Sequence, residues 1–138
     1  MTAEELWIKS GLTGEYDAWG FGDEELTELV RSGKKTATSS AFILYELEDE
    51  DLPEVGETSI LLDDNEEAVC IIRTTKVYTA PFNEVTAEHA SKEGEGDLSL
   101  DYWRQVHKDF FTEELEEAGQ QFTEDMLVVC EEFEVIFK

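Results

Sequence analysis

Basic residues are scarce in this sequence. Its 138 residues include 35 acidic and 10 basic side chains, so the formal net charge at pH 7 is −25. Attraction to a nucleic-acid backbone grows with the number of phosphates that Lys and Arg neutralise, which excludes long double-stranded DNA as a partner. A short RNA segment can still bind if the few cations converge on one face, because salt screens charges beyond about 8 Å. The acidity itself serves solubility or reflects a salt-rich environment.

Cysteine is also scarce, and long apolar runs are missing. Cys70 and Cys130 each lie in an alternating apolar stretch without a neighbouring Cys or His, which predicts buried thiols in a reduced protein. No run approaches the roughly 18 apolar residues of a membrane span, and the first ten residues lack the regions of a signal peptide. We therefore expect a cytoplasmic protein without membrane contact. The sequence has neither the residue spacing of a calcium-binding loop nor an HExxH motif, so neither a metal nor another cofactor is expected.

The chain nevertheless carries enough apolar material for a core. Hydrophobic residues make up 41% of the sequence and aromatic residues 11%, which is sufficient for one domain over residues 1–138. No internal repeat or linker divides the chain. The sequence predicts no particular oligomeric state.

Helical periodicity indicates a short N-terminal helix and three further helices. The segment 24–31 follows Asp23, a good N-cap. A short helix is expected between residues 82 and 93, with Thr86 as its N-cap. The clearest helix spans residues 99–118, because its large apolar side chains recur on one stripe.

Period-two alternation indicates the strands. Residues 58–63 and 67–80 flank a turn and predict a hairpin, and residues 126–138 predict a long closing strand. Helices inserted between grouped strands are typical of an α+β domain with a small curved sheet.

The segment GKKTATSS, residues 33–40, is the one cationic island. Lys34 and Lys35 precede a cluster of hydroxyl side chains that includes Thr38 and Ser39. Such a stretch can bind an anion or supply a nucleophile. Its plainer interpretation is a helix stop at Gly33 followed by the start of a strand.

Three separated blocks, GKKTATSS, EHASKEGEGD and SLDYWRQVHKDFF, resemble the ASCH domain family in their order. The likeness covers about residues 19–137 and belongs to the longer bacterial branch. It implies a PUA-like β-barrel with flanking helices and a cleft that binds RNA or a modified nucleoside. Some members are similar to amidohydrolases that deacetylate N4-acetylcytidine with a threonine, a lysine and a glutamate, which the motif places at Thr38, Lys35 and Glu93. Other members are described as RNA-binding modules or RNA-cleaving enzymes, so membership alone selects no reaction.

The implied residues must satisfy definite chemical conditions. A threonine hydroxyl needs a base to remove its proton, and Lys35 can be that base only as a neutral amine. A nearby Glu93 stabilises the ammonium instead, so it suits proton transfer or substrate orientation. In a regular strand residues 35 and 38 point to opposite faces, so their cooperation requires a bend between them.

Other residues are candidates for substrate binding. We expect the cations Lys34, Lys35, Arg73 and Arg104 near one cleft. Tyr102 and Trp103 can stack on a base or pack in the core. His107, on the apolar helical stripe, is a core or cleft histidine, whereas His89 is expected to be exposed. The substrate-binding candidates are Lys34, Ser39, Arg73, Tyr102, Trp103, Arg104 and His107.

Overall fold

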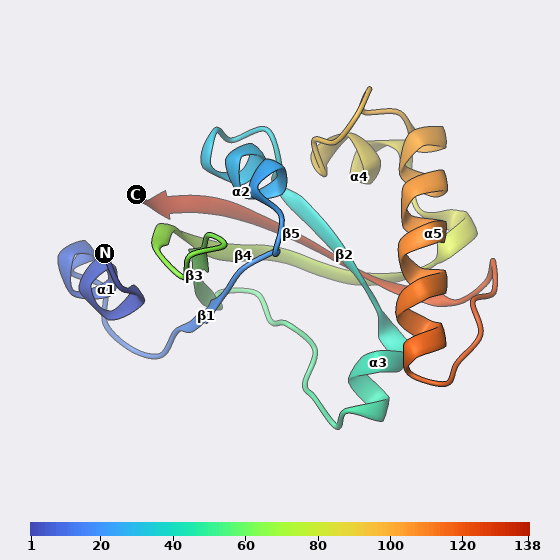
Figure 1. The fold of residues 1–138 in the computed structure, drawn as a ribbon, viewed down its shortest axis with the longest axis horizontal. Helices are drawn as coiled ribbons and strands as arrows, with labels where there is room; N and C mark the ends of the chain where they lie inside the picture. The colour runs from blue at the N-terminus through green and yellow to red at the C-terminus, as the bar shows by residue number, and fades with distance from the viewer.

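A computed structural model describes residues 1–138 as one curled sheet with helices around it (Figure 1). The strands are β1 (Asp17–Trp19), β2 (Ala37–Ala41), β3 (Thr58–Leu62), β4 (Ala68–Pro81) and β5 (Leu127–Phe137). Their order in the sheet is β1-β3-β4-β5-β2. β1 and β3 are parallel, and the other neighbours are antiparallel. The sheet curls into a half-barrel, which confirms the predicted α+β fold with a small curved sheet.

The curl of the sheet has a local cause in β4. The register between β4 and β5 shifts at Ile71/Ile72 and again between Thr74 and Lys76. Such bulges add a residue to one strand, bend it and increase its twist. The outer strands β1 and β2 are therefore carried toward one another across the open side of the half-barrel.

Five α-helices and one 3-10 helix flank the sheet. They are α1 (Ala3–Ser10), α2 (Glu24–Arg31), α3 (Phe42–Leu47), η1 (Phe82–Glu84), α4 (Ala87–Lys92) and α5 (Leu100–Glu117). In Figure 1, α5 crosses one end of the sheet beside α4, while α1 lies at the other end. No helix is long and apolar enough to cross a membrane.

Most of the predicted helix boundaries are confirmed. The Asp23 side chain accepts hydrogen bonds from the backbone N–H groups of Glu25 and Leu26 and begins α2. Thr86 caps α4 in the same way through the N–H of His89. The predicted helix over 82–93 is divided in two, because the backbone of Val85 is extended between η1 and α4. The short strand β1 was not predicted, since its three residues are ordered by pairing with β3.

The largest core cluster holds α5 against the sheet. It includes Phe82, Trp103, Phe111, Leu115 and Val128, all almost fully buried. Two smaller clusters lie under α2 and α1. Both cysteines are buried free thiols, as predicted. The apolar stripe of α5 thus faces the sheet and holds the helix residues of the site described next.

Candidate functional site

A cavity of about 430 Å³ lies between β2, α5 and the loops before α2 and after α4. Its apolar walls come from Phe21, Leu26, Val106 and Phe110, and the Phe110 ring is half-exposed at the surface. The other lining residues are Gly22, Asp23, Lys35, Thr38, Ser39, Glu93, Glu95 and His107. The cavity therefore combines apolar walls with a charged floor.

Glu93 is the centre of that floor and is only 1% exposed. It follows the last residue of α4, and Gly94 after it adopts a left-handed backbone with φ +73°. A Cβ atom at Gly94 would overlap the backbone carbonyl oxygen of Lys34. Glycine at this position therefore lets the Glu93 loop approach the segment that carries Lys35.

One oxygen of Glu93 contacts the amino group of Lys35 and the ring of His107. Oε1 lies 3.1 Å from Lys35 Nζ and 3.4 Å from His107 Nε2. Lys35, itself 2% exposed, also lies 3.4 Å from Glu95 Oε2. Two carboxylates thus hold Lys35 as a buried ammonium, and breaking such a pair leaves an uncompensated charge.

The other oxygen of Glu93 contacts uncharged donors. Oε2 accepts hydrogen bonds from Trp103 Nε1 and from Ser39 Oγ, the latter at 2.7 Å. His89 Nε2 lies 3.2 Å from Oε2 and 2.7 Å from Ser39 Oγ. His89 Nδ1 is buried without a hydrogen-bond partner. A carboxylate that orients a catalytic histidine contacts the nitrogen opposite the nucleophile, so these three residues are not arranged as a catalytic triad.

These contacts decide the charge of Glu93. Burial alone would raise its pKa, but hydrogen bonds from His107 and His89 and the charge of Lys35 hold the pKa well below its ordinary value. Glu93 is therefore ionised near neutral pH and its electron pairs are occupied by donors. It positions Lys35, Ser39 and the two histidines and is poorly suited to accept a proton itself.

Thr38 and Ser39 lie on opposite faces of β2. Ser39 shares with Lys35 the side that faces Glu93, whereas Thr38 is the cross-strand partner of Glu131 on β5. Lys35 precedes β2, which begins at Ala37. Thr38 nevertheless lines the same cavity as Lys35, and it also lines a second cavity of about 400 Å³. Lys35 and Thr38 therefore both line the first cavity, although Lys35 lies before the strand and Thr38 within it.

The second cavity opens between β1, β2 and β5. It contains Glu131 and shares Phe21, Thr38 and Ser39 with the first cavity. Its other lining residues are Asp17, Trp19, Ser40, Tyr45, Glu50, Asp51, Pro53, Glu57 and Ser59. It contains several carboxylates and no basic residue.

The structure brings together five of the residues singled out from the sequence. Lys35, Thr38, Ser39, Glu93 and His107 line the first cavity. Trp103 lies directly beneath them and is buried.

The remaining candidates lie elsewhere. Lys34 lines a separate hollow beside Gly94 and Gly96. Arg73 lies on β4 in register with Glu134, and the Arg104 guanidinium donates to the Asn83 carbonyl. The Tyr102 ring lies against Gly96. Among the four cations expected at one cleft, Lys35 alone lines the cavity.

Several site residues were missed from the sequence. His89 was expected to be exposed, and this was wrong: it is 1% exposed and contacts Ser39 and Glu93. Its i,i+4 spacing to Glu93 on a short helix was the available signal. Glu95 and Phe21 each lie between two glycines, which was a weak signal for residues held against a ligand site.

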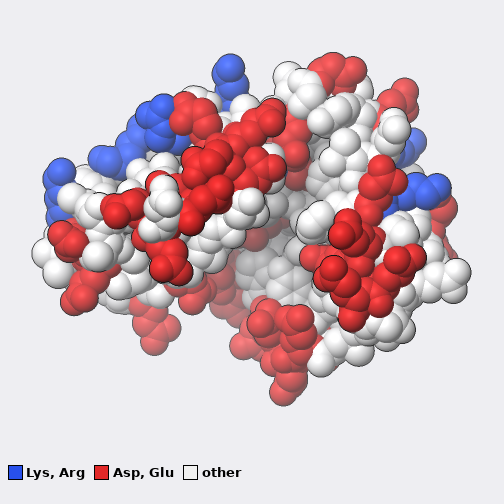
Figure 2. Space-filling model, in the orientation of Figure 1, with Lys and Arg blue, Asp and Glu red and all other residues white.

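Three acidic residues, Asp23, Glu93 and Glu95, line the first cavity, and the surface of the protein is also acidic. On the face drawn in Figure 2, acidic side chains lie on both sides of a central hollow, while most basic side chains in this view lie near the outer edges. A ligand that carries several phosphates would meet repulsion here.

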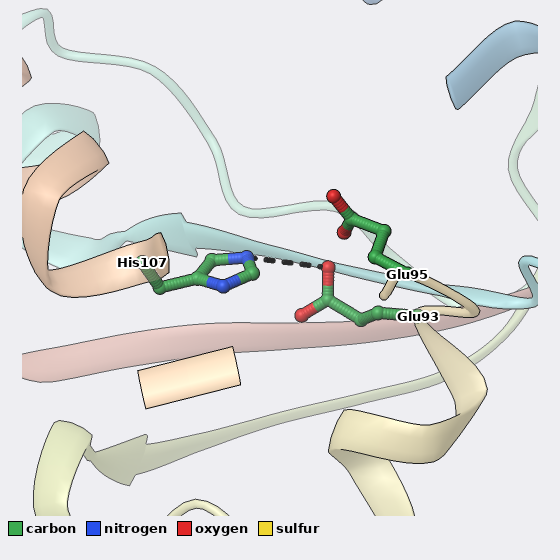
Figure 3. A group of neighbouring side chains, drawn as sticks. All are labelled: Glu93, Glu95 and His107. Atoms are coloured by element: carbon green, nitrogen blue, oxygen red, sulfur yellow. Dashed lines mark ion pairs between the residues drawn. The ribbon is translucent and has the colours of Figure 1, made fainter. Parts of the chain in front are cut away.

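Glu93, Glu95 and His107 also have the composition of a metal site. Their ligand atoms lie within 4.8 Å of one another, and Figure 3 shows the ring of His107 facing Glu93. Lys35 Nζ, however, contacts both carboxylates at 3.1 and 3.4 Å and already supplies the positive charge. We therefore assign no metal to this group.

Comparisons with known proteins agree with the fold. Residues 17–137 match the family model described as ASCH domain. The ASCH domain structure from Lactobacillus crispatus JV V101 is 29% identical, with a TM-score of 0.89 over 98% of this chain and 94% of that one. Protein EF3133 from Enterococcus faecalis V583 is 42% identical, with a TM-score of 0.86 over 97% of this chain and 85% of that one. No curated protein matches the sequence.

Proposed function

Because the chain belongs to the ASCH domain family, we propose that its cavity hydrolyses the amide of an N4-acylated cytosine nucleoside. The observation that carries this proposal is that Lys35, Thr38 and Glu93 line one cavity. They are separated in sequence by up to 58 positions. Together they supply a hydroxyl, a cation and a carboxylate in a space that also has apolar side chains in its walls.

The cavity supports an uncharged aromatic ligand. Its volume of about 430 Å³ lies within the range of small-molecule sites, roughly 300–1,000 Å³. Phe21 and Phe110 offer aromatic faces at its walls, and the acidic surroundings disfavour polyphosphate or RNA. A free nucleoside therefore suits the site better than an RNA segment.

Each polar group has a role that follows from its contacts. The Lys35 ammonium polarises the acyl carbonyl and stabilises the oxyanion that forms on attack. Glu93 and Glu95 hold Lys35 in position. Thr38 Oγ1 attacks the acyl carbon, so an oxygen–carbon bond forms, the carbonyl electron pair moves to oxygen and the hydroxyl proton must be accepted.

Glu131 is the acceptor that suits Thr38. Cross-strand partners leave the same face of a sheet with their Cβ atoms about 5 Å apart, and these two residues are partners. Glu131 has no cation beside it, and burial raises its pKa although a hydrogen bond from Thr74 lowers it. A carboxylate with a raised pKa is a better base than one held by cations, as Glu93 is.

Incubation with N4-acetylcytidine tests the proposal. We expect the wild-type protein to release acetate and cytidine, and Thr38→Ala to reduce kcat at least about 1,000-fold with nucleoside affinity within about tenfold. Ser40→Ala is the matched control, because it removes a hydroxyl two residues along the same strand and should keep activity within about threefold. Binding of the nucleoside without acetate release would indicate a binding module without chemistry.

A further inference from the structure

We propose that His107 is the proton donor that releases the amine from the tetrahedral intermediate. This inference rests on the proposed amide hydrolysis and deepens it. It starts from the difference between the two histidines that contact Glu93.

The contacts of His107 point to a proton on each ring nitrogen. Nδ1 lies 2.9 Å from the backbone carbonyl oxygen of Trp103, which can only accept, so Nδ1 must donate. Nε2 lies 3.4 Å from Glu93 Oε1, an oxygen of an ionised carboxylate, which also only accepts. A neutral ring would direct a lone pair at that oxygen. The contacts therefore select the imidazolium form of His107.

The contacts of His89 favour a neutral ring instead. Its Nδ1 is buried without a partner, so an imidazolium would bury an unsatisfied N–H group. Its Nε2 lies 2.7 Å from Ser39 Oγ, which in turn donates to Glu93. In a neutral ring with its proton on Nε2, that proton is donated to Ser39 Oγ, and the Ser39 hydroxyl donates to Glu93. The two histidines thus share a carboxylate and carry different charges.

The proton on His107 Nε2 is available to a ligand. Its distance of 3.4 Å to Glu93 Oε1 is longer than the 2.7–3.2 Å of an ordinary N–H···O hydrogen bond. His107 lines the cavity, and its ring stacks on Trp103 with centroids 4.3 Å apart. The stacked ring and the Nδ1 hydrogen bond fix the orientation of Nε2. No other imidazole lines the cavity.

The charged and polar groups around His107 come from three parts of the chain. Glu93 and Glu95 follow α4, Lys35 precedes β2, and Trp103 contributes its carbonyl from α5 itself. Glu93 and Glu95 favour the imidazolium, whereas Lys35 opposes it. Because Lys35 is paired with both carboxylates, its repulsion of a positive charge on the His107 ring is reduced.

The proton transfers balance over the cycle. When the intermediate collapses, the oxyanion re-forms the carbonyl, the carbon–nitrogen bond breaks and the nitrogen takes the proton of His107 Nε2. Water then attacks the acyl-Thr38 ester and gives its proton back to Nε2. The Thr38 oxygen leaves with the proton that Glu131 accepted. Acid and amine are released, and the site returns to its starting state.

A comparison of two substrates tests the proton donor. Release of an amine requires a proton, whereas p-nitrophenolate leaves p-nitrophenyl acetate without one. In His107→Gln, which keeps a neutral polar side chain, we expect the rate at which the amide acylates Thr38 in a single turnover to fall about 100-fold or more. The burst of p-nitrophenolate that reports acylation by the ester should stay within about threefold. Lys108→Gln, on the exposed side of the same helix, should leave both rates unchanged.

Nitrogen-15 NMR of the free protein gives a readout without substrate. We expect protons on both ring nitrogens of His107 and on only one of His89 at pH 7. A neutral His107, or an equal loss of the amide and ester acylation rates in His107→Gln, would overturn the inference. A wild-type protein that hydrolyses neither substrate would instead overturn the proposed function, and the donor role would fall with it. Acetate release that persists in His107→Gln would leave the hydrolase standing and reject the donor alone.

Discussion

The two cavities that share Thr38 each contain a buried glutamate, and the two glutamates differ in the groups that contact them. In the first cavity, Glu93 contacts Lys35, His107, Trp103 and Ser39. In the second, Glu131 accepts a hydrogen bond from the Thr74 hydroxyl, 2.7 Å away, and has no cation partner. Burial raises the pKa of both groups, but only the donors around Glu93 reverse its effect.

The protein produces two kinds of carboxylate from one residue type. The chain has few cations, and it places one of them, Lys35, almost without solvent contact beside Glu93. Glu93 is thereby a fixed charge that organises the site, while Glu131 remains able to exchange a proton. The difference lies in the neighbouring donors and not in the depth of burial alone.

The largest expected effect comes from removing the fixed charge. Glu93→Gln leaves the Lys35 ammonium without its closest partner, so we expect the free energy of unfolding at pH 7 to fall by about 3–5 kcal/mol. Urea unfolding measures this change. Glu28→Gln is the matched control, since Glu28 pairs with Arg31 at the surface and its replacement should leave the free energy of unfolding nearly unchanged. Equal losses in the two variants would show that burial of the Glu93 pair contributes nothing.

The pH dependence of stability separates Glu93 from the other carboxylates. Its pKa in the folded protein lies well below the ordinary value of a glutamate in an unfolded chain, so folding favours the ionised form. The resulting stability is present above that value and is lost as the pH falls through the lower folded pKa. We therefore expect wild-type stability to fall on acidification from pH 5, and the slope to be smaller in Glu93→Gln. Urea midpoints measured at successive pH values check this, and parallel slopes in the two proteins would contradict it.

The fold and the site were not equally predictable from the sequence. Local signals were sufficient for α2, α4 and α5, because Asp23, Thr86 and the apolar stripe of residues 99–118 act within a few residues. β1 depends on a distant strand and was missed. The sequence motif indicated Lys35, Thr38 and Glu93.

Burial and pairing at the site could not be read from the sequence. Whether a lysine is a solvated surface residue or a buried ion depends on which carboxylates fold against it. Glu95 reaches Lys35 only because the glycines beside it allow the loop to turn back. The same limitation explains why His89 was placed at the surface, since its neighbours Ser39 and Trp103 come from other elements.

The smallest expected effect has the opposite sign and concerns Glu131. Because burial is the main cause of its raised pKa, ionisation of this group opposes folding as the pH rises above its unfolded value. Glu131→Gln keeps an acceptor for Thr74 and removes that cost, so we expect stability at pH 7 to be unchanged or to rise by up to about 1 kcal/mol. At pH 4, where the raised pKa already keeps Glu131 largely neutral, the gain should disappear. Urea unfolding at both pH values, beside Glu93→Gln, measures the contrast. If Glu131→Gln instead destabilises the protein as strongly as Glu93→Gln, Glu131 is also a fixed structural charge. It could then not accept the Thr38 proton.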